Sequence, residues 1–139
     1  AAREIAEAVD GELYRITPAQ PYTGADLNWM DKGSRSSLEM ADENCRPALA
    51  EPGKDLSGYD TVFLGFPIWW YVEPRVVDSF LEACDLSGRT VIPFATSGGS
   101  GIEKAEQRLR RQYPRVNWKA GRLLNRSGAA AWARQMIDG

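Results

Sequence analysis

Two short runs of apolar residues constrain the fold of this chain more than any other feature. "YDTVFLGF" at residues 59–66 contains a continuous apolar run at residues 62–64, and "TVIPFA" at residues 90–95 contains a run at residues 91–95; neither run alternates in polarity. Such strands are typical of parallel sheets, in which crossover helices cover both faces. Between the two runs, residues 76–81 place apolar side chains at helical spacing just after Pro74, a residue favoured in the first turn of a helix. This arrangement predicts an α/β fold with a parallel sheet.

The rest of the chain continues the alternation of strands and helices. The length of 139 residues predicts one domain, spanning residues 1–139. Residues 18–57 are rich in Asp, Asn, Ser and Pro, and a segment of that length is usually functional or partly structured. The other expected elements are helices at residues 1–10, 36–43, 103–112 and 129–137 and strands at residues 12–16 and 116–120.

Charge and hydropathy exclude two classes of partner. Seventeen basic and nineteen acidic residues give a net charge of −2. The basic cluster Arg108, Arg110 and Arg111 accompanies Glu103 and Glu106, and we interpret it as a solvated helix face. No apolar run approaches the roughly 18–20 residues that span a membrane. We therefore expect no nucleic-acid partner and no membrane span.

The absence of histidine limits the chemistry that side chains can perform. Ser-His and Cys-His nucleophile systems and the common zinc sites all require histidine, and the sequence has none. Cys45 and Cys84 lack metal-ligand spacing, and we interpret them as reduced, half-buried thiols. A bound cofactor, or no chemistry at all, is the remaining choice.

Two unusual loops follow the two apolar runs. "PIWW" at residues 67–70 and "TSGGSG" at residues 96–101 each leave the carboxyl end of a predicted strand, so both should lie at the same edge of the sheet. Indoles stack on flat rings, and glycine backbone can approach a ring edge closely. Together the loops predict a slot for a flat, polar heterocycle. Taken singly, they have plainer interpretations as a turn and as indoles that cover the core.

The same region resembles a known family. "YDTVFLGFPIWWYVEPRVVDSFLEACDLSGRTVIPFATSGGSG" is similar to the flavodoxin-like proteins, in particular to the branch with Gly-[FY]-Pro-Ile-Trp-Trp and Thr-Ser-Gly-Gly-Ser-Gly loops. "PAQPYTGADLNW", "SRSS" and "CRPAL" resemble the long insertion before the third strand of the family, so the likeness covers nearly the whole chain. It implies a doubly wound parallel sheet of order 2-1-3-4-5 with FMN at the carboxyl ends of the strands.

The resemblance also implies roles for the residues of the two loops. Residues 67–70 would line the isoalloxazine ring, with Trp69 or Trp70 stacked on it. Residues 96–101 would bond the pyrimidine edge and the N5 side of the ring through backbone groups. No catalytic side chain and no metal is implied. The expected cofactor-binding residues are Pro67, Ile68, Trp69, Trp70, Thr96, Ser97, Gly98, Gly99, Ser100 and Gly101.

The sequence departs from the family pattern at its start. The first strand and the phosphate loop, of the type Ser-x-Thr-Gly-Asn-Thr, are not in the sequence, and Ala1 already lies inside a predicted helix. That strand would be central, between residues 12–16 and 59–66, so we do not expect a stable monomer without it. Three explanations are open. A segment precedes Ala1 in the natural protein, another chain or a swapped strand fills the gap, or the protein has lost its phosphate site.

The expected function is that of an electron-transfer flavoprotein with FMN bound, a flavodoxin. In such proteins the flavin performs the redox chemistry. One alternative is an oxidoreductase, an FMN-dependent NAD(P)H:quinone-type reductase. Another is a non-flavin binding module on the same scaffold. The expected partner is accordingly a redox protein or NAD(P)H. Cytoplasmic is the default location, with a signal or lipid anchor upstream of Ala1 left open.

Overall fold

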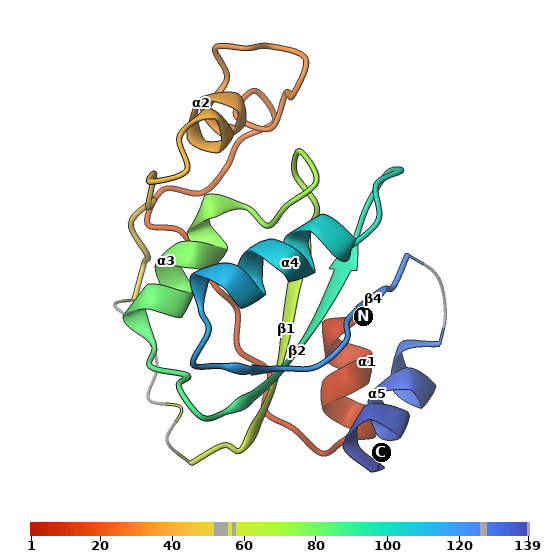
Figure 1. Cartoon of the computed structure of the whole chain (residues 1–139). Helices are drawn as coiled ribbons and strands as arrows, with labels where there is room; N and C mark the ends of the chain where they lie inside the picture. Colours follow the sequence, from red (N-terminus) through yellow and green to blue (C-terminus); the bar gives the residue numbers. More distant parts are fainter. Residues whose placement is uncertain (52–55, 57, 126–127, 139) are drawn as a thin grey trace.

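The computed structural model describes residues 1–51, 56, 58–125 and 128–138. Five helices and four strands are assigned within these residues, and Figure 1 shows their arrangement. The helices are α1 (Ala2–Ala8), α2 (Arg35–Ala41), α3 (Arg75–Ala83), α4 (Glu103–Gln112) and α5 (Ala129–Asp138). The strands are β1 (Thr61–Pro67), β2 (Thr90–Thr96), β3 (Asn117–Trp118) and β4 (Arg122–Leu123).

The sheet is parallel, as the apolar runs predict. β1 pairs with β2 along its whole length, from Thr61 opposite Thr90 to Pro67 opposite Thr96. β3 and β4 both pair with the other edge of β2, also in parallel. The connection from β1 to β2 runs through α3, so this unit is the βαβ crossover that parallel neighbours require. The prediction of a parallel α/β fold is confirmed.

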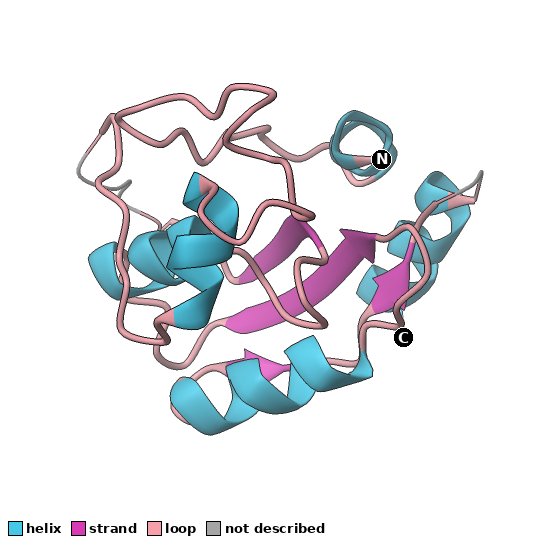
Figure 2. Cartoon of the chain, turned by 90° about the horizontal axis from the view of Figure 1, so that it is seen from above, coloured by secondary structure: helices cyan, strands magenta, loops and turns pink. Residues whose placement is uncertain are grey.

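Helices cover both faces of the sheet. On one face, α3 and α4 pack against β1 and β2, with Val77 and Leu109 in the core cluster that contains Leu64. On the other face, α1 and α5 contact each other and pack around Ile92 and Trp132. Figure 2 shows the two helix pairs on opposite sides of the strands. The sheet is therefore buried on both faces, which explains its continuous apolar sequence.

The strand predicted at residues 116–120 is interrupted, and Pro93 is the reason. The carbonyls of Val91 and Ala95 in β2 accept hydrogen bonds from the N–H groups of Lys119 and Leu124, at 3.0 and 2.7 Å. Pro93 lies between them and faces the same neighbour, but it has no N–H to donate. Gly121 lies beside it, where a Cβ would come within 2.5 Å of the Pro93 carbonyl oxygen. The segment therefore divides into β3 and β4.

The strand predicted at residues 12–16 is wrong, because the structure has no regular element there. A cavity of about 820 Å³ separates this segment from β1, lined by apolar side chains that include Ile5 and Phe80. Within the described residues no strand pairs with this edge of β1. Without a neighbouring strand, the backbone N–H and C=O groups of residues 12–16 have no ladder to join, so they form no strand. The observed sheet thus corresponds to the last three strands of the predicted order 2-1-3-4-5.

The long segment between residues 18 and 51 forms an excursion that stands out from the sheet at the top of Figure 1. The predicted short helix is present as α2, and the Ser34 side chain caps it by accepting a hydrogen bond from the Ser37 N–H. Arg75 of α3 is buried and donates to the Met40 carbonyl at 3.0 Å, which ties the excursion to the domain. Among the described helices, none has the length and apolar character needed to cross a membrane.

Candidate functional site

The two loops singled out by the sequence lie side by side. The loop after β1 begins at Ile68, whose N–H donates a hydrogen bond of 2.9 Å to the carbonyl of Thr96 at the end of β2. This bond extends the parallel ladder by one step beyond the strands. The expected convergence of the loops at one edge of the sheet is therefore found, and residues 67–70 and 96–101 meet there.

Residues 69–72 of the loop after β1 form a tight hairpin, the Trp hairpin, with an unusual backbone. Trp69 and Val72 exchange both backbone hydrogen bonds, at 2.9 and 3.1 Å. The two residues between them, Trp70 and Tyr71, have φ angles of +46° and +72°. Two central residues with positive φ are typical of type I′ turns, which are usually built from Asn and Gly. Left-handed backbone costs roughly 1–2 kcal/mol per residue when a large side chain adopts it. The hairpin is therefore strained at its tip.

The two adjacent tryptophans have different surroundings. Trp69 is half-buried, its ring contacts the ring of Tyr22 edge-on at a centroid distance of 5.3 Å, and it also lines the cavity beside β1. Trp70 is 43% exposed and Tyr71 is 55% exposed at the tip. The ammonium of Lys104 lies 4.5 Å from the centre of the Tyr71 ring. Tyr22 of the excursion therefore holds the half-buried indole of Trp69 in place, whereas the indole of Trp70 lies at the exposed tip.

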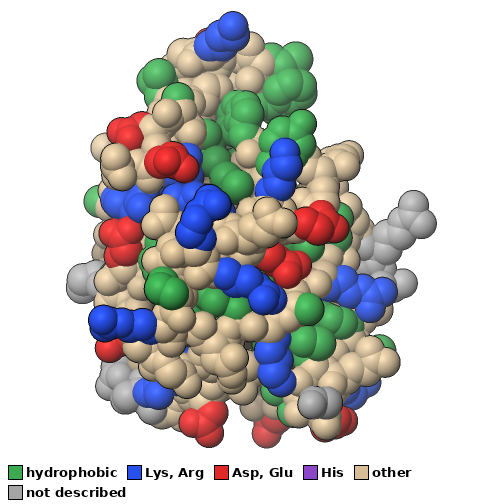
Figure 3. Space-filling model, in the orientation of Figure 1, with side chains coloured by type: hydrophobic (Ala, Val, Ile, Leu, Met, Phe, Trp, Pro, Cys, Tyr) green, Lys and Arg blue, Asp and Glu red, His purple; other side chains and the backbone are tan. Residues whose placement is uncertain are grey.

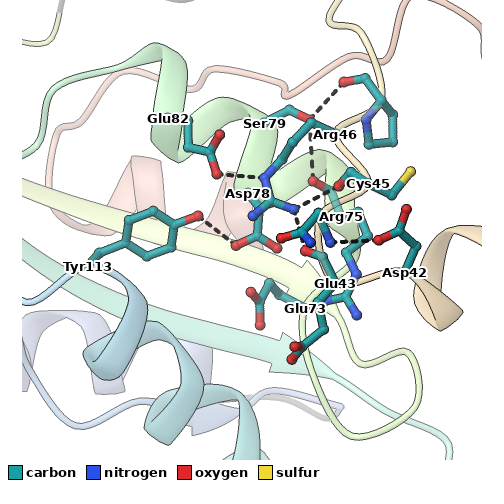
Figure 4. A network of polar contacts seen from close by, with 12 residues as sticks. Asp42, Glu43, Cys45, Arg46, Glu73, Arg75, Asp78, Ser79, Glu82 and Tyr113 are labelled. Atoms are coloured by element: carbon teal, nitrogen blue, oxygen red, sulfur yellow. Dashed lines mark hydrogen bonds and ion pairs between the residues drawn. The ribbon is translucent and has the colours of Figure 1, made fainter.

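A buried ionic cluster lies where the hairpin joins α3. Arg108 of α4 donates to the carboxylates of Glu73 and Asp78, at 3.0 Å in the case of Asp78. The Tyr113 hydroxyl donates to Asp78 at 2.7 Å, as Figure 4 shows. The sequence interpretation of Arg108 as part of a solvated face is wrong, because its guanidinium is buried against these two acids. Its sequence neighbour Arg110 is exposed, as expected.

The cluster contains two carboxylates and one guanidinium. Burial raises the pKa of Glu73 to about 8, the neighbouring charge of Asp78 adds to the rise, and Arg108 opposes it. Burial and the nearby charge of Asp78 therefore favour the protonated form of Glu73 relative to an exposed carboxyl. The residue follows directly after the hairpin, so its anchorage fixes the base on which Trp69 and Trp70 stand.

Hydrogen bonds hold the loop after β2, residues 96–101, which is the Gly/Ser loop. The Ser97 hydroxyl oxygen accepts from the N–H groups of Gly99 and Ser100, at 3.2 and 2.8 Å. The side-chain amide of Asn125 bonds the Ser97 backbone at both ends, with its oxygen accepting from the N–H at 2.8 Å and its nitrogen donating to the carbonyl at 2.7 Å. Sequence reasoning missed Asn125, although a polar residue after a weak strand at the same sheet edge was a usable signal.

These bonds narrow the predicted role of the loop. The N–H groups of Ser97, Gly99 and Ser100 already have partners inside the protein. Gly98 has no such bond from its N–H within the described residues, and a Cβ added to Gly98 or Gly99 would meet nothing within 4 Å. This stretch of backbone is therefore open to the close approach of a flat ligand. Within the same residues, no group of acidic, Cys or His side chains could hold a metal ion.

An open parallel sheet with loops converging at its carboxyl edge defines the doubly wound class of α/β proteins. The sequence model of the flavodoxin family matches residues 1–138. The chain belongs to the flavodoxin family.

Solved structures agree with this assignment. A crystal structure of a "putative flavoprotein" from Bacteroides uniformis ATCC 8492 is 51% identical, with a TM-score of 0.91, and the match covers 99% of this chain and 87% of that one. A second, also of a "putative flavoprotein", from Bacteroides eggerthii DSM 20697, is 51% identical with a TM-score of 0.90 and covers 98% and 85% of the two chains. No curated protein matches the chain.

Proposed function

We propose that this protein binds FMN between the Trp hairpin and the Gly/Ser loop and transfers electrons as a flavodoxin. One observation carries the proposal. The bond from the Ile68 N–H to the Thr96 carbonyl sets an aromatic loop and a glycine loop next to each other at the carboxyl edge of a parallel sheet. Family membership and the names of the two similar structures support a flavin as the ligand.

The residues at this edge fit a flavin ring. Trp69 and Trp70 offer flat apolar surface for its face. Gly98 and Gly99 have no side chain between their backbone and the ring, and the Gly98 N–H is available to bond its edge. A flat, largely apolar ring with a polar edge requires this combination of surfaces.

When bound, the flavin supplies the redox chemistry, and the protein supplies binding and electrostatics. The indoles would cover the ring and exclude water from one side. The Gly/Ser loop would orient the ring by bonding its polar edge. No side chain has to act as an acid or base, which agrees with a sequence that lacks histidine.

One contact favours a second candidate function, an FMN-dependent NAD(P)H:quinone-type reductase. Lys104 places a positive charge over Tyr71 at the rim of the site. A cation there suits the anionic phosphates of NAD(P)H. The net charge is only −2, and basic and acidic side chains are interspersed over the face shown in Figure 3, which disfavours a strongly acidic docking face for a redox protein.

The proposal is tested by titrating the protein with FMN and following the quenching of flavin fluorescence, with riboflavin as the control. Tighter binding of FMN than of riboflavin would show that the phosphate is recognised. Absence of binding by both would overturn the proposal and favour a non-flavin binding module. NADPH added to the FMN-bound protein separates the two flavin functions, because a reductase bleaches the flavin band directly and a carrier requires a reductase partner.

A further inference from the structure

Asn125 follows β4 and brings a third strand end to the candidate site. β4 runs parallel to β2, so the chain leaves both strands at the same edge of the sheet. The N–H of Leu124 bonds the Ala95 carbonyl at 2.7 Å and keeps the segment beside β2 up to this point. Asn125 thereby reaches the start of the Gly/Ser loop from a different part of the chain.

The Asn125 side chain matches the backbone of Ser97 in both of its functions. An amide carries an acceptor and a donor together, and here the acceptor meets the Ser97 N–H while the donor meets the Ser97 carbonyl. Two bonds of 2.8 and 2.7 Å fix both the position and the orientation of this residue. A carboxylate could satisfy only the first of them.

Ser97 transmits this constraint to the rest of the turn. Its hydroxyl oxygen accepts from Gly99 and Ser100 and closes the turn around Gly98. Gly98 and Gly99 have no side chain, and the space around their Cβ positions is open, so packing does not hold the turn. Glycine also has the largest conformational freedom to lose. The order of the turn therefore depends on Ser97, and Ser97 depends on Asn125.

We propose that Asn125 is the positioning residue of the flavin site, holding residues 97–100 in the shape that receives the ring. The inference rests on the proposed function, and Asn125 acts through Ser97 rather than by touching the ligand. A turn that is already ordered loses little freedom on binding. If the turn adopts the competent shape only part of the time, the apparent affinity falls by that fraction.

The first test compares Asn125→Ala with Asn117→Ala in FMN titrations. Asn117 is a matched control, because its side chain also bonds a terminal residue of β2, Thr90, at 3.1 Å, but at the opposite end of the strand. If the turn of Asn125→Ala is competent about one tenth of the time, the dissociation constant for FMN rises about tenfold. We expect Asn117→Ala to bind FMN like the wild type, and the two variants to unfold at similar temperatures.

A second readout separates positioning from a general loss of structure. In the flavin-free protein, hydrogen exchange of the Ser97 amide should speed up in Asn125→Ala and stay unchanged in Asn117→Ala. Asn125→Asp keeps the acceptor but loses the donor, and it adds a negative charge beside the turn. The potential of FMN bound to Asn125→Asp should therefore be more negative, with Asn117→Asp as the charge-matched control.

Each outcome decides the inference. Weaker FMN binding with faster Ser97 exchange in Asn125→Ala supports it. FMN affinity equal to that of Asn117→Ala overturns it, and so does a loss of affinity with unchanged Ser97 exchange. If the wild type binds no FMN, the proposed function fails first, and the exchange measurement alone decides whether Asn125 positions the turn.

Discussion

The two loops at the carboxyl edge of the sheet are held in opposite ways. The Trp hairpin has left-handed backbone at Trp70 and Tyr71 and is anchored through the buried Glu73. The Gly/Ser turn is anchored by hydrogen bonds from Ser97 and Asn125. Left-handed backbone is costly at Trp70 and Tyr71, whereas the freer backbone of a glycine turn depends on hydrogen bonds to stay ordered. The strained loop should therefore be sensitive to its anchor, and the glycine turn to its hydrogen bonds.

The largest expected effect comes from removing the cation of the hairpin anchor. Arg108→Ala leaves the acids Glu73 and Asp78 buried without their partner, which should lower the free energy of unfolding by about 3–5 kcal/mol. Arg110→Ala is the control on the same helix, because its side chain is exposed and its ion pair with Glu106 spans 3.9 Å. Urea unfolding of the two variants measures the difference. Equal losses would contradict the prediction, because the buried cluster would then contribute no more to stability than an exposed ion pair.

Stability should also depend on pH through Glu73. Its pKa is raised from 4.5 to about 8 in the folded protein, so between these values the folded state holds a proton that the unfolded state has released. The free energy of unfolding therefore falls as pH rises through this window, with a slope of up to about 1.4 kcal/mol per pH unit. Glu73→Gln should remove this contribution, and Glu103→Gln on the exposed side of α4 should keep it. The prediction is contradicted if the free energy of unfolding changes between pH 5 and pH 8 by the same amount in Glu73→Gln and in the wild type.

A smaller effect should distinguish the two tryptophans. Trp69 is held by Tyr22 and lines the cavity, so it loses little freedom when a ring stacks on it. We expect Trp69→Ala to weaken FMN binding by about 1–1.5 kcal/mol, the value of a lost aromatic contact, and Trp70→Ala to weaken it less. Fluorescence titration of both variants measures this. If both bind FMN like the wild type, neither indole stacks on the ring.

The smallest effect should report the strain itself. Tyr71→Asn and Tyr71→Ala both remove the ring and its contact with Lys104, but Asn adopts left-handed backbone more readily than Ala. The Asn variant should therefore be more stable than the Ala variant by about 0.5–1 kcal/mol. The difference between the two thermal midpoints measures it. Identical midpoints would mean that the hairpin tip relaxes without cost.

Most regular elements could be predicted because their signals are local. The apolar runs of β1 and β2 and the helical spacing of α3 each lie within about ten residues, and the charged helix α4 has the predicted bounds, Glu103–Gln112. The strand expected at residues 12–16 failed because a strand depends on its neighbours, and local alternation says nothing about a ladder partner.

The candidate site was only partly predictable, for a similar reason. The two loops could be found because their residue types are unusual and the parallel topology brings them together. The partners of those loops come from distant parts of the chain. Arg108 contacts Glu73 from 35 residues away, and Asn125 contacts Ser97 from 28 residues away. Nothing in the pattern around Arg108 distinguishes a buried guanidinium from an exposed one.

The gap between β3 and β4, opposite Pro93, also affects whether a second molecule can pair with this edge of the sheet. A long, regular outer strand presents a row of unpaired backbone groups on which a second molecule can add its own strand. Here the outer edge consists of two pieces of two residues each, β3 and β4. Neither piece is long enough to serve as a template. A proline in the central strand β2 thus protects the β3–β4 side of the sheet against aggregation.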